Sequence, residues 1–125
     1  MIVGLGIDLV EHSRVERELA RGDWLLGNGI FSSQEIQHCS NGRRPALRYA
    51  ACFAAKEATL KALGVVVSDL AIFREVEVGS SMDSKYAVVL HHRLKSESQR
   101  LGVRRIRLSL AATAKQTGAM VILES

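Results

Sequence analysis

The alanine-rich segment from Pro45 to Gly64 constrains the fold of this chain more than any other stretch. Pro45 suits the first turn of a helix, where a backbone N–H group has no intrahelical partner, and Gly64 suits the residue that ends one. The sequence therefore predicts one long helix over this segment. Its alanines leave room for another element to approach the helix closely.

Two charged residues, Glu57 and Lys61, interrupt the apolar side of this predicted helix. On a helical wheel of about 100° per residue, Glu57 falls between Phe53 and Ala50, and Lys61 falls between the two alanines Ala50 and Ala54. An exposed Glu-Lys pair at this spacing would stabilise a helix by only about 0.2–0.5 kcal/mol. A carboxylate shielded from solvent would instead need a partner or a cation. The residues alone leave both interpretations open.

The opening segment from Met1 to Val10 alternates as a β-strand does. One face of this predicted strand carries Ile2, Gly4, Gly6 and Asp8. Glycines on that face would allow another backbone or a ligand to come close to the Asp8 carboxylate.

Packing of this strand beside the long helix would bring Asp8, Glu57 and Lys61 together. Mg²⁺ prefers oxygen ligands and usually binds one or two carboxylates together with substrate phosphates and water. A lysine supplies a mobile positive charge to a phosphate oxygen. The three residue types therefore permit a metal and diphosphate site, although they do not by themselves require one.

Shorter elements are predicted on both sides of the long helix. Ser13 and Glu16 have the spacing of a capping box, and Ser32 or Ser33 can cap a further helix. No internal repeat is visible, and the pattern predicts an α+β fold, with a small, largely antiparallel sheet packed on the long helix. The expected helices cover Ser13 to Leu26, Gln34 to Cys39 and Leu94 to Leu101, and the expected strands cover Ala71 to Val78, Tyr86 to Leu90, Ile106 to Leu110 and Ala119 to Leu123.

The composition excludes several classes of protein. A chain of 125 residues that is 47% hydrophobic is expected to form a single domain over residues 1–125. Its net charge of +4 indicates an anionic partner, but 5% aromatic residues and dispersed arginines disfavour nucleic acid. The apolar start is too short to span a membrane and contains Asp8, so no membrane or export signal is visible. Cys39 and Cys52 are too few for a disulfide framework, which favours the cytoplasm.

The strand and the long helix carry longer motifs, GLGIDLVE from Gly4 to Glu11 and YAACFAAKEATLKALG from Tyr49 to Gly64. Together they resemble the holo-acyl-carrier-protein synthase family of phosphopantetheinyl transferases. The similarity continues through IFSSQEIQHC from Ile30 to Cys39 and through the closing SLAAT and VILE segments, and it is weakest from Val65 to Leu101. The resemblance implies a 4′-phosphopantetheinyl transferase-like fold.

The resemblance also implies an activity, the transfer of 4′-phosphopantetheine from coenzyme A to a serine of an acyl carrier protein. Asp8 and Glu57 would hold Mg²⁺ with the coenzyme A diphosphate, and Lys61 would contact that diphosphate. The serine would attack the β-phosphate and adenosine 3′,5′-bisphosphate would leave, so catalysis would rest on positioning and electrostatic stabilisation. Either Glu57 or a metal-bound water would take the serine proton.

Members of the resembled family form trimers with active sites between subunits and bind an acidic carrier protein on the first basic helix. That implies a carrier-binding role for Arg14, Arg17 and Arg21, with Arg14 the strongest candidate. Without the resemblance, these arginines would be interpreted as a solvated helix face. Lys56 belongs to the long motif but points away from Glu57 on the wheel, so it would serve the helix surface or coenzyme recognition. The implied pathway is fatty acid and lipid synthesis, although the residues do not reveal which carrier is modified.

Several positions depart from the family pattern. Ala112 stands in place of a histidine, and an alanine can neither hydrogen-bond a phosphate nor move a proton. Cys52 and Gly29 stand where many relatives carry arginine, and Cys52 is predicted to be a buried structural thiol. His92 occupies the position of a family glycine. These departures motivate an alternative function, a catalytically weakened relative that binds coenzyme A or a carrier protein as an interaction module.

Overall fold

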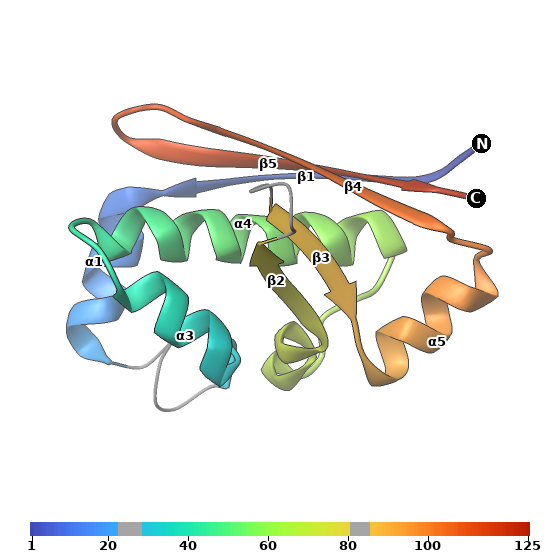
Figure 1. Ribbon diagram of the computed structural model, residues 1–125, viewed down its shortest axis with the longest axis horizontal. Coiled ribbons are helices and arrows are strands. Elements are labelled where there is room, and N and C mark those ends of the chain that lie inside the picture. The colour runs from blue at the N-terminus through green and yellow to red at the C-terminus, as the bar shows by residue number, and fades with distance from the viewer. Residues whose placement is uncertain (23–28, 81–85) are drawn as a thin grey trace.

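The computed structural model describes residues 1–22, 29–80 and 86–125. The long helix α4 (Pro45–Leu63) lies between two layers (Figure 1). A three-stranded sheet covers one side of α4, and the shorter helices and a two-stranded sheet lie on the other side. The predicted α+β class is confirmed, since every strand pair within the described residues is antiparallel.

The three-stranded sheet joins the two ends of the chain. It consists of β1 (Ile2–Glu11), β5 (Gln116–Glu124) and β4 (Arg105–Ala112), in that order across the sheet. In the antiparallel register of β1 and β5, Asp8 lies opposite Ala119. The first strand is thereby fixed in position by the last strand of the chain.

The two faces of β1 differ in burial, as the alternation of its sequence predicts. Gly6, Asp8 and Val10 are buried on the face toward α4. The opposite face is turned away from α4 and remains apolar and more than half exposed. Its exposed side chains are those of Leu5, Ile7 and Leu9.

Both predicted ends of α4 are confirmed. Pro45 stands in the first turn, and Gly64 follows the last turn with a φ of 70°. The N–H group of Gly64 donates to the carbonyl oxygen of Lys61 at 3.1 Å, which closes the helix in a left-handed cap. Buried residues occur around most of the α4 circumference, because packed layers lie on two sides of the helix.

Six shorter elements cover the other side of α4. The two strands among them form an antiparallel pair in which Val78 lies opposite Val88. The six elements are α1 (His12–Arg21), α3 (Ser33–Ser40), η1 (Leu70–Glu75), β2 (Val76–Ser80), β3 (Tyr86–Leu90) and α5 (His92–Arg100).

The helix α3 begins with the cap that the sequence predicted, and the cap is completed as a capping box. The N–H group of Glu35 donates to Ser32 Oγ at 3.2 Å, and the N–H group of Ser32 donates to Glu35 Oε1 at 2.8 Å. Of the two serines considered, Ser32 is therefore the cap.

The capping box predicted at Ser13 is wrong. The helix α1 begins one residue earlier, at His12, and the preceding Glu11 makes no side-chain cap. The strand β1 runs directly into this helix, and the His12 N–H group donates to the carbonyl oxygen of Lys115 at 2.9 Å. The β4–β5 connection thus satisfies a donor that a capping side chain would otherwise accept. Residues 23–26 of the predicted helix lie outside the described residues.

Two boundaries after α4 also differ from the prediction. The predicted strand over residues 71–78 is wrong up to Glu75, because Asp69 Oδ1 accepts from the Ala71 N–H at 3.0 Å and starts the 3₁₀ helix η1. The last helix, α5, begins at His92 rather than at Leu94. His92 has a φ of 50°, which is the conformation that suits a glycine.

None of the helices in the described parts of the chain combines the length and the apolar character needed to cross a membrane. Cys39 and Cys52 are free and buried, so the prediction that Cys52 is a buried thiol is confirmed.

Candidate active site

Two glycines on the inner face of β1 let the strand lie directly against the backbone of α4. A Cβ atom at Gly6 would collide with the carbonyl oxygen of Ala58, and one at Gly4 would collide with that of Ala62. Any larger residue would push the strand away from the helix. The close approach expected from these glycines is therefore confirmed, and it brings Asp8 to the charged side chains of α4.

The Asp8 carboxylate is buried, with 8% of its surface exposed. Its Oδ1 accepts a hydrogen bond from Lys61 Nζ at 2.9 Å, and the same ammonium donates to the carbonyl oxygen of Ile7 at 3.2 Å. The Lys61 side chain is 56% exposed, so it reaches Asp8 from the solvent side. Among the described residues, none gives Asp8 Oδ2 a hydrogen bond. A buried carboxylate oxygen without a partner is costly, and it marks a position for a cation or a further donor.

Glu57 lies one helical turn before Lys61 and shares its surroundings with Asp8. Burial raises the pKa of Glu57 to about 7, and Asp8 adds to the increase because it could accept a hydrogen bond from a protonated Glu57 and because the two negative charges repel. The positive charges of Lys61 and Arg14 act in the opposite direction on this pKa. Two carboxylates share a hydrogen bond only while one of them holds a proton. Asp8 and Glu57 therefore need either that proton or a cation beside them.

This donor set fits Mg²⁺. Asp8 and Glu57 supply carboxylate oxygens from a strand and a helix, and Asp8 Oδ2 lacks a partner within the described structure. No group of three or more His, Cys, Asp or Glu side chains in the described residues could hold a metal ion. Mg²⁺ commonly takes one or two carboxylates and completes its coordination with water and substrate phosphates. The two carboxylates therefore fit a site that a phosphate-bearing substrate completes.

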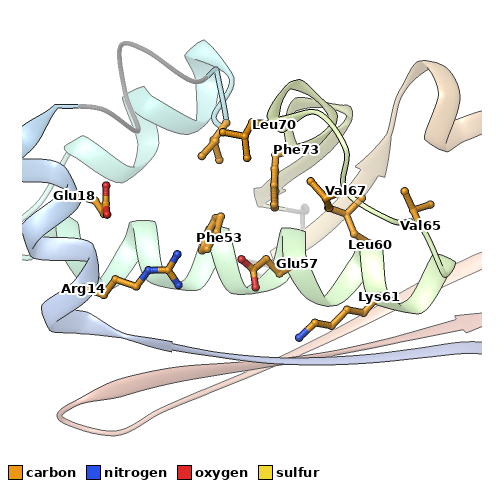
Figure 2. Close-up of a pocket in the computed structure, with 11 residues that line it drawn as sticks. Arg14, Glu18, Phe53, Glu57, Leu60, Lys61, Val65, Val67, Leu70 and Phe73 are labelled. Atoms are coloured by element: carbon orange, nitrogen blue, oxygen red, sulfur yellow. The ribbon is translucent and has the colours of Figure 1, made fainter.

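A cavity of about 580 Å³ opens beside these groups (Figure 2). Figure 2 shows Arg14, Glu57 and Lys61 on the side of the cavity nearest the sheet. Glu18 is a fourth charged residue of its wall. The remaining lining is apolar and includes Phe53, Leu60, Val65, Val67, Leu70 and Phe73. The cavity therefore suits a ligand that combines a charged group with a neutral arm.

Lys56 is placed differently from the helix-surface position expected for it. It is fully buried, and its Nζ forms an ion pair with Glu35 at 2.8 Å. The same Nζ donates to the carbonyl oxygens of Phe73 and Val76 at 2.8 and 2.6 Å. These three acceptors use all the N–H groups of the ammonium. The surface interpretation is wrong, because η1, β2 and α3 cover this side of α4, and a contact between Lys56 and coenzyme A stays an untested prediction.

Glu35 is a buried charged residue that the sequence did not single out. Its Oε2 accepts from the Val78 N–H at 2.8 Å and from Cys52 Sγ at 3.4 Å. The sequence predicted a cap at Ser32 or Ser33 without its partner Glu35, and nothing in the sequence pairs Glu35 with Lys56. Glu18, which the sequence did not single out, lines the cavity.

The three arginines of α1 have different surroundings. Arg14 lines the cavity, and its guanidinium carbon lies 5.7 Å from the centroid of the Phe53 ring. All three arginines are exposed, and Arg17 and Arg21 do not line this cavity. The helix thus contributes one of its three arginines to the cavity wall.

The departures from the family pattern lie outside the cavity lining. Ala112 is exposed at the end of β4, opposite Thr117, whose Oγ1 lies 2.8 Å from His12 Nε2. Gly29 has a φ of 60°, which a glycine adopts without strain. Cys52 belongs to the buried network around Glu35.

Comparisons with known proteins agree with this geometry. Residues 4–114 match the family described as the 4′-phosphopantetheinyl transferase superfamily. A holo-[acyl-carrier-protein] synthase of Koribacter versatilis is 38% identical over 125 residues, which covers 99% of each chain. One of Syntrophus aciditrophicus is 35% identical over 124 residues, which covers 99% of this chain and 97% of the relative.

Solved structures of holo-[acyl-carrier-protein] synthases have the same fold as this chain. The holo-[acyl-carrier-protein] synthase of Neisseria meningitidis superposes with a TM-score of 0.86 at 26% identity, covering 100% of both chains. The enzyme of Bacillus anthracis, solved in complex with CoA (3′,5′-ADP), gives a TM-score of 0.76 at 28% identity and covers 100% of this chain and 98% of that one. The chain therefore belongs to the holo-acyl-carrier-protein synthase family of 4′-phosphopantetheinyl transferases, as its motifs predicted.

Proposed function

We propose that the protein transfers 4′-phosphopantetheine from coenzyme A to a serine of an acyl carrier protein, with Mg²⁺, and releases adenosine 3′,5′-bisphosphate. The observation that carries this proposal is the meeting of Asp8 with Glu57 and Lys61, two residues that line one cavity, with Asp8 Oδ2 left without a described partner. Two carboxylates and an ammonium at a cavity are suited to a metal-bound diphosphate.

In this proposal Asp8 and Glu57 hold Mg²⁺, which when bound neutralises charge on the diphosphate. Lys61 contacts the diphosphate through its exposed ammonium group. The carrier serine oxygen attacks the β-phosphorus, a new P–O bond forms, and the bond to the bridging oxygen breaks, so that adenosine 3′,5′-bisphosphate leaves with the electron pair. Glu57, whose carboxylate lines the cavity, is also our candidate to accept the serine proton.

The carrier protein is proposed to bind along α1. Arg14, Arg17 and Arg21 lie on this helix, and the chain carries a net charge of +4. Such a surface suits an acidic carrier by charge complementarity. The two buried free thiols are compatible with the cytoplasm, where we place the reaction, in fatty acid and lipid synthesis.

We further propose that three copies of the chain assemble, with the active sites between subunits. The support is the outward face of the sheet, where Leu5, Ile7 and Leu9 are 57%, 53% and 64% exposed beside Met120 at 40%. A continuous apolar face of this kind is typical of a protein–protein contact. Light scattering after gel filtration should give a trimer for the natural chain and smaller species for Leu5→Lys. A monomeric natural chain would contradict this part of the proposal.

The deciding experiment is mass spectrometry of an apo carrier protein after incubation with the protein, coenzyme A and Mg²⁺. A mass gain of one phosphopantetheine group on the carrier serine is expected, and chelation of the metal should prevent it. Binding of coenzyme A with no adduct on any of several carriers would refute the transferase and support the interaction-module alternative.

A further inference from the structure

Arg14 differs from the other arginines of α1 in where its charge is directed. Figure 2 shows its side chain extending from α1 toward Glu57, which lies between Arg14 and Lys61. Arg14 and Lys61 line the same cavity as Glu57, but they come from different helices. Cations from α1 and α4 therefore lie on opposite sides of one carboxylate.

The guanidinium of Arg14 also lies over an aromatic ring. Its central carbon lies 5.7 Å from the Phe53 centroid, within the range of a cation–π contact. Phe53 is 4% exposed and belongs to the rigid long helix, so the ring is a fixed platform. A side chain restricted in this way loses less conformational entropy when it binds a ligand.

All three arginines of α1 are exposed, but of the three only Arg14 lines the cavity. A role limited to attracting a carrier protein would not require one arginine of the helix to bend over Phe53 into the cavity.

The chemistry of the two cations is complementary. A lysine ammonium acts as a point charge, whereas a guanidinium presents a planar set of donors that matches two oxygens of one phosphate. A diphosphate offers two such groups at neighbouring positions. We propose that Arg14 binds a phosphate of the coenzyme A diphosphate, as a second cation opposite Lys61, in addition to any contact with the carrier protein. This inference rests on the proposed function.

The test measures the affinity of coenzyme A without any carrier protein. Titration calorimetry with Mg²⁺ would compare the natural chain with Arg14→Met and with the matched controls Arg17→Met and Arg21→Met. Methionine keeps apolar contact with Phe53 and removes the charge. Loss of a charge-assisted hydrogen bond is expected to weaken binding to Arg14→Met by roughly 10-fold or more, with Arg14→Lys intermediate. Both controls should bind coenzyme A as the natural chain does.

Two outcomes separate this inference from the function on which it rests. If Arg14→Met binds coenzyme A with the affinity of the natural chain and only the KM for the carrier rises, Arg14 is a docking residue and the inference is overturned. If the natural chain binds no coenzyme A, the proposed function itself is overturned. Circular dichroism establishes that each variant is folded, and Arg14→Lys preserves the test if the methionine variant is not.

Discussion

Lys56 and Lys61 lie five residues apart on one helix and have opposite environments. Lys56 is fully buried and gives its three donors to Glu35 and to two carbonyl oxygens. Lys61 is 56% exposed and contacts an aspartate whose second oxygen has no partner among the described residues. The closed network of Glu35 and Lys56 connects α4 to α3, η1 and β2. The open network of Asp8, Glu57 and Lys61 adjoins a cavity.

The difference shows which of the two networks can bind a ligand. A buried ion pair with all of its hydrogen bonds made has no free donor or acceptor for a ligand. Removing either partner leaves an uncompensated buried charge and destabilises the fold. A carboxylate pair with a raised pKa and an unmatched oxygen is less stable alone and gains from a cation. Substitutions in the first network should therefore affect folding, and substitutions in the second should affect transfer.

The largest effect is expected when the open network loses a carboxylate. Glu57→Gln and Asp8→Ala should each reduce metal-dependent transfer at least about 100-fold, the usual scale for loss of a key electrostatic group. Thermal unfolding should show a folded protein in both cases. Transfer rates measured by mass spectrometry check this prediction, and full activity in either variant would exclude the proposed mechanism.

The same lysine-to-methionine substitution at Lys56 and at Lys61 compares the closed network with the open one. Lys56→Met leaves Glu35 buried without its cation and should cost about 3–5 kcal/mol of unfolding free energy. Lys61→Met removes an exposed ammonium but leaves the buried Asp8 carboxylate without this donor, so it should cost less, about 1–3 kcal/mol. Urea unfolding curves measure both, and equal losses would remove the distinction between the two lysines.

A smaller effect is expected where the strand meets the helix. Gly6→Ala places a Cβ against the Ala58 carbonyl oxygen and should cost about 1–3 kcal/mol, because the strand must move. Transfer should fall as well, since Asp8 lies on the same strand. Gly79→Ala is the control, because a Cβ at Gly79 has no neighbour within 4 Å among the described atoms. An unaffected Gly6→Ala variant would show that the close packing is not required.

The smallest effect concerns pH. The pKa of Glu57 rises from about 4.5 to about 7 on folding. Between these values the folded metal-free protein holds a proton that the unfolded chain has released, so Glu57 makes stability fall as pH rises through this window. Glu57→Gln should therefore gain in Tm relative to the natural chain from pH 4.5 to 7.5, modestly because Glu57 is partly exposed. Mg²⁺ should stabilise the natural chain more at pH 8 than at pH 5. A constant Tm difference would contradict the raised pKa.

Much of the open site could be predicted from the sequence. The ends of α4 followed from Pro45 and Gly64, and the inner face of β1 followed from its alternation with glycines. What the residues left conditional was the packing of that strand on that helix, because periodicity defines faces and not their partners. The resemblance to the family implied that the strand packs on the helix, and the structure confirms this packing.

The closed network could not be predicted in the same way. Its members, Glu35 and Lys56, belong to different helices, and their pairing depends on how α3 folds back on α4. A buried lysine looks the same in sequence as a surface lysine. The cap at Ser13 failed for a related reason, because the His12 N–H is satisfied by Lys115 from the far end of the chain.

The alternating burial of strand β1 limits which insertions and deletions the gene can tolerate. Side chains alternate with a period of two, so an insertion or deletion of one residue between Gly4 and Asp8 would invert every later position of the strand. The carboxylate would then point to the outside and an aliphatic side chain would meet the helix. A single-codon indel here should be as damaging as losing Asp8 itself, whereas length changes of two residues would at least preserve the facing.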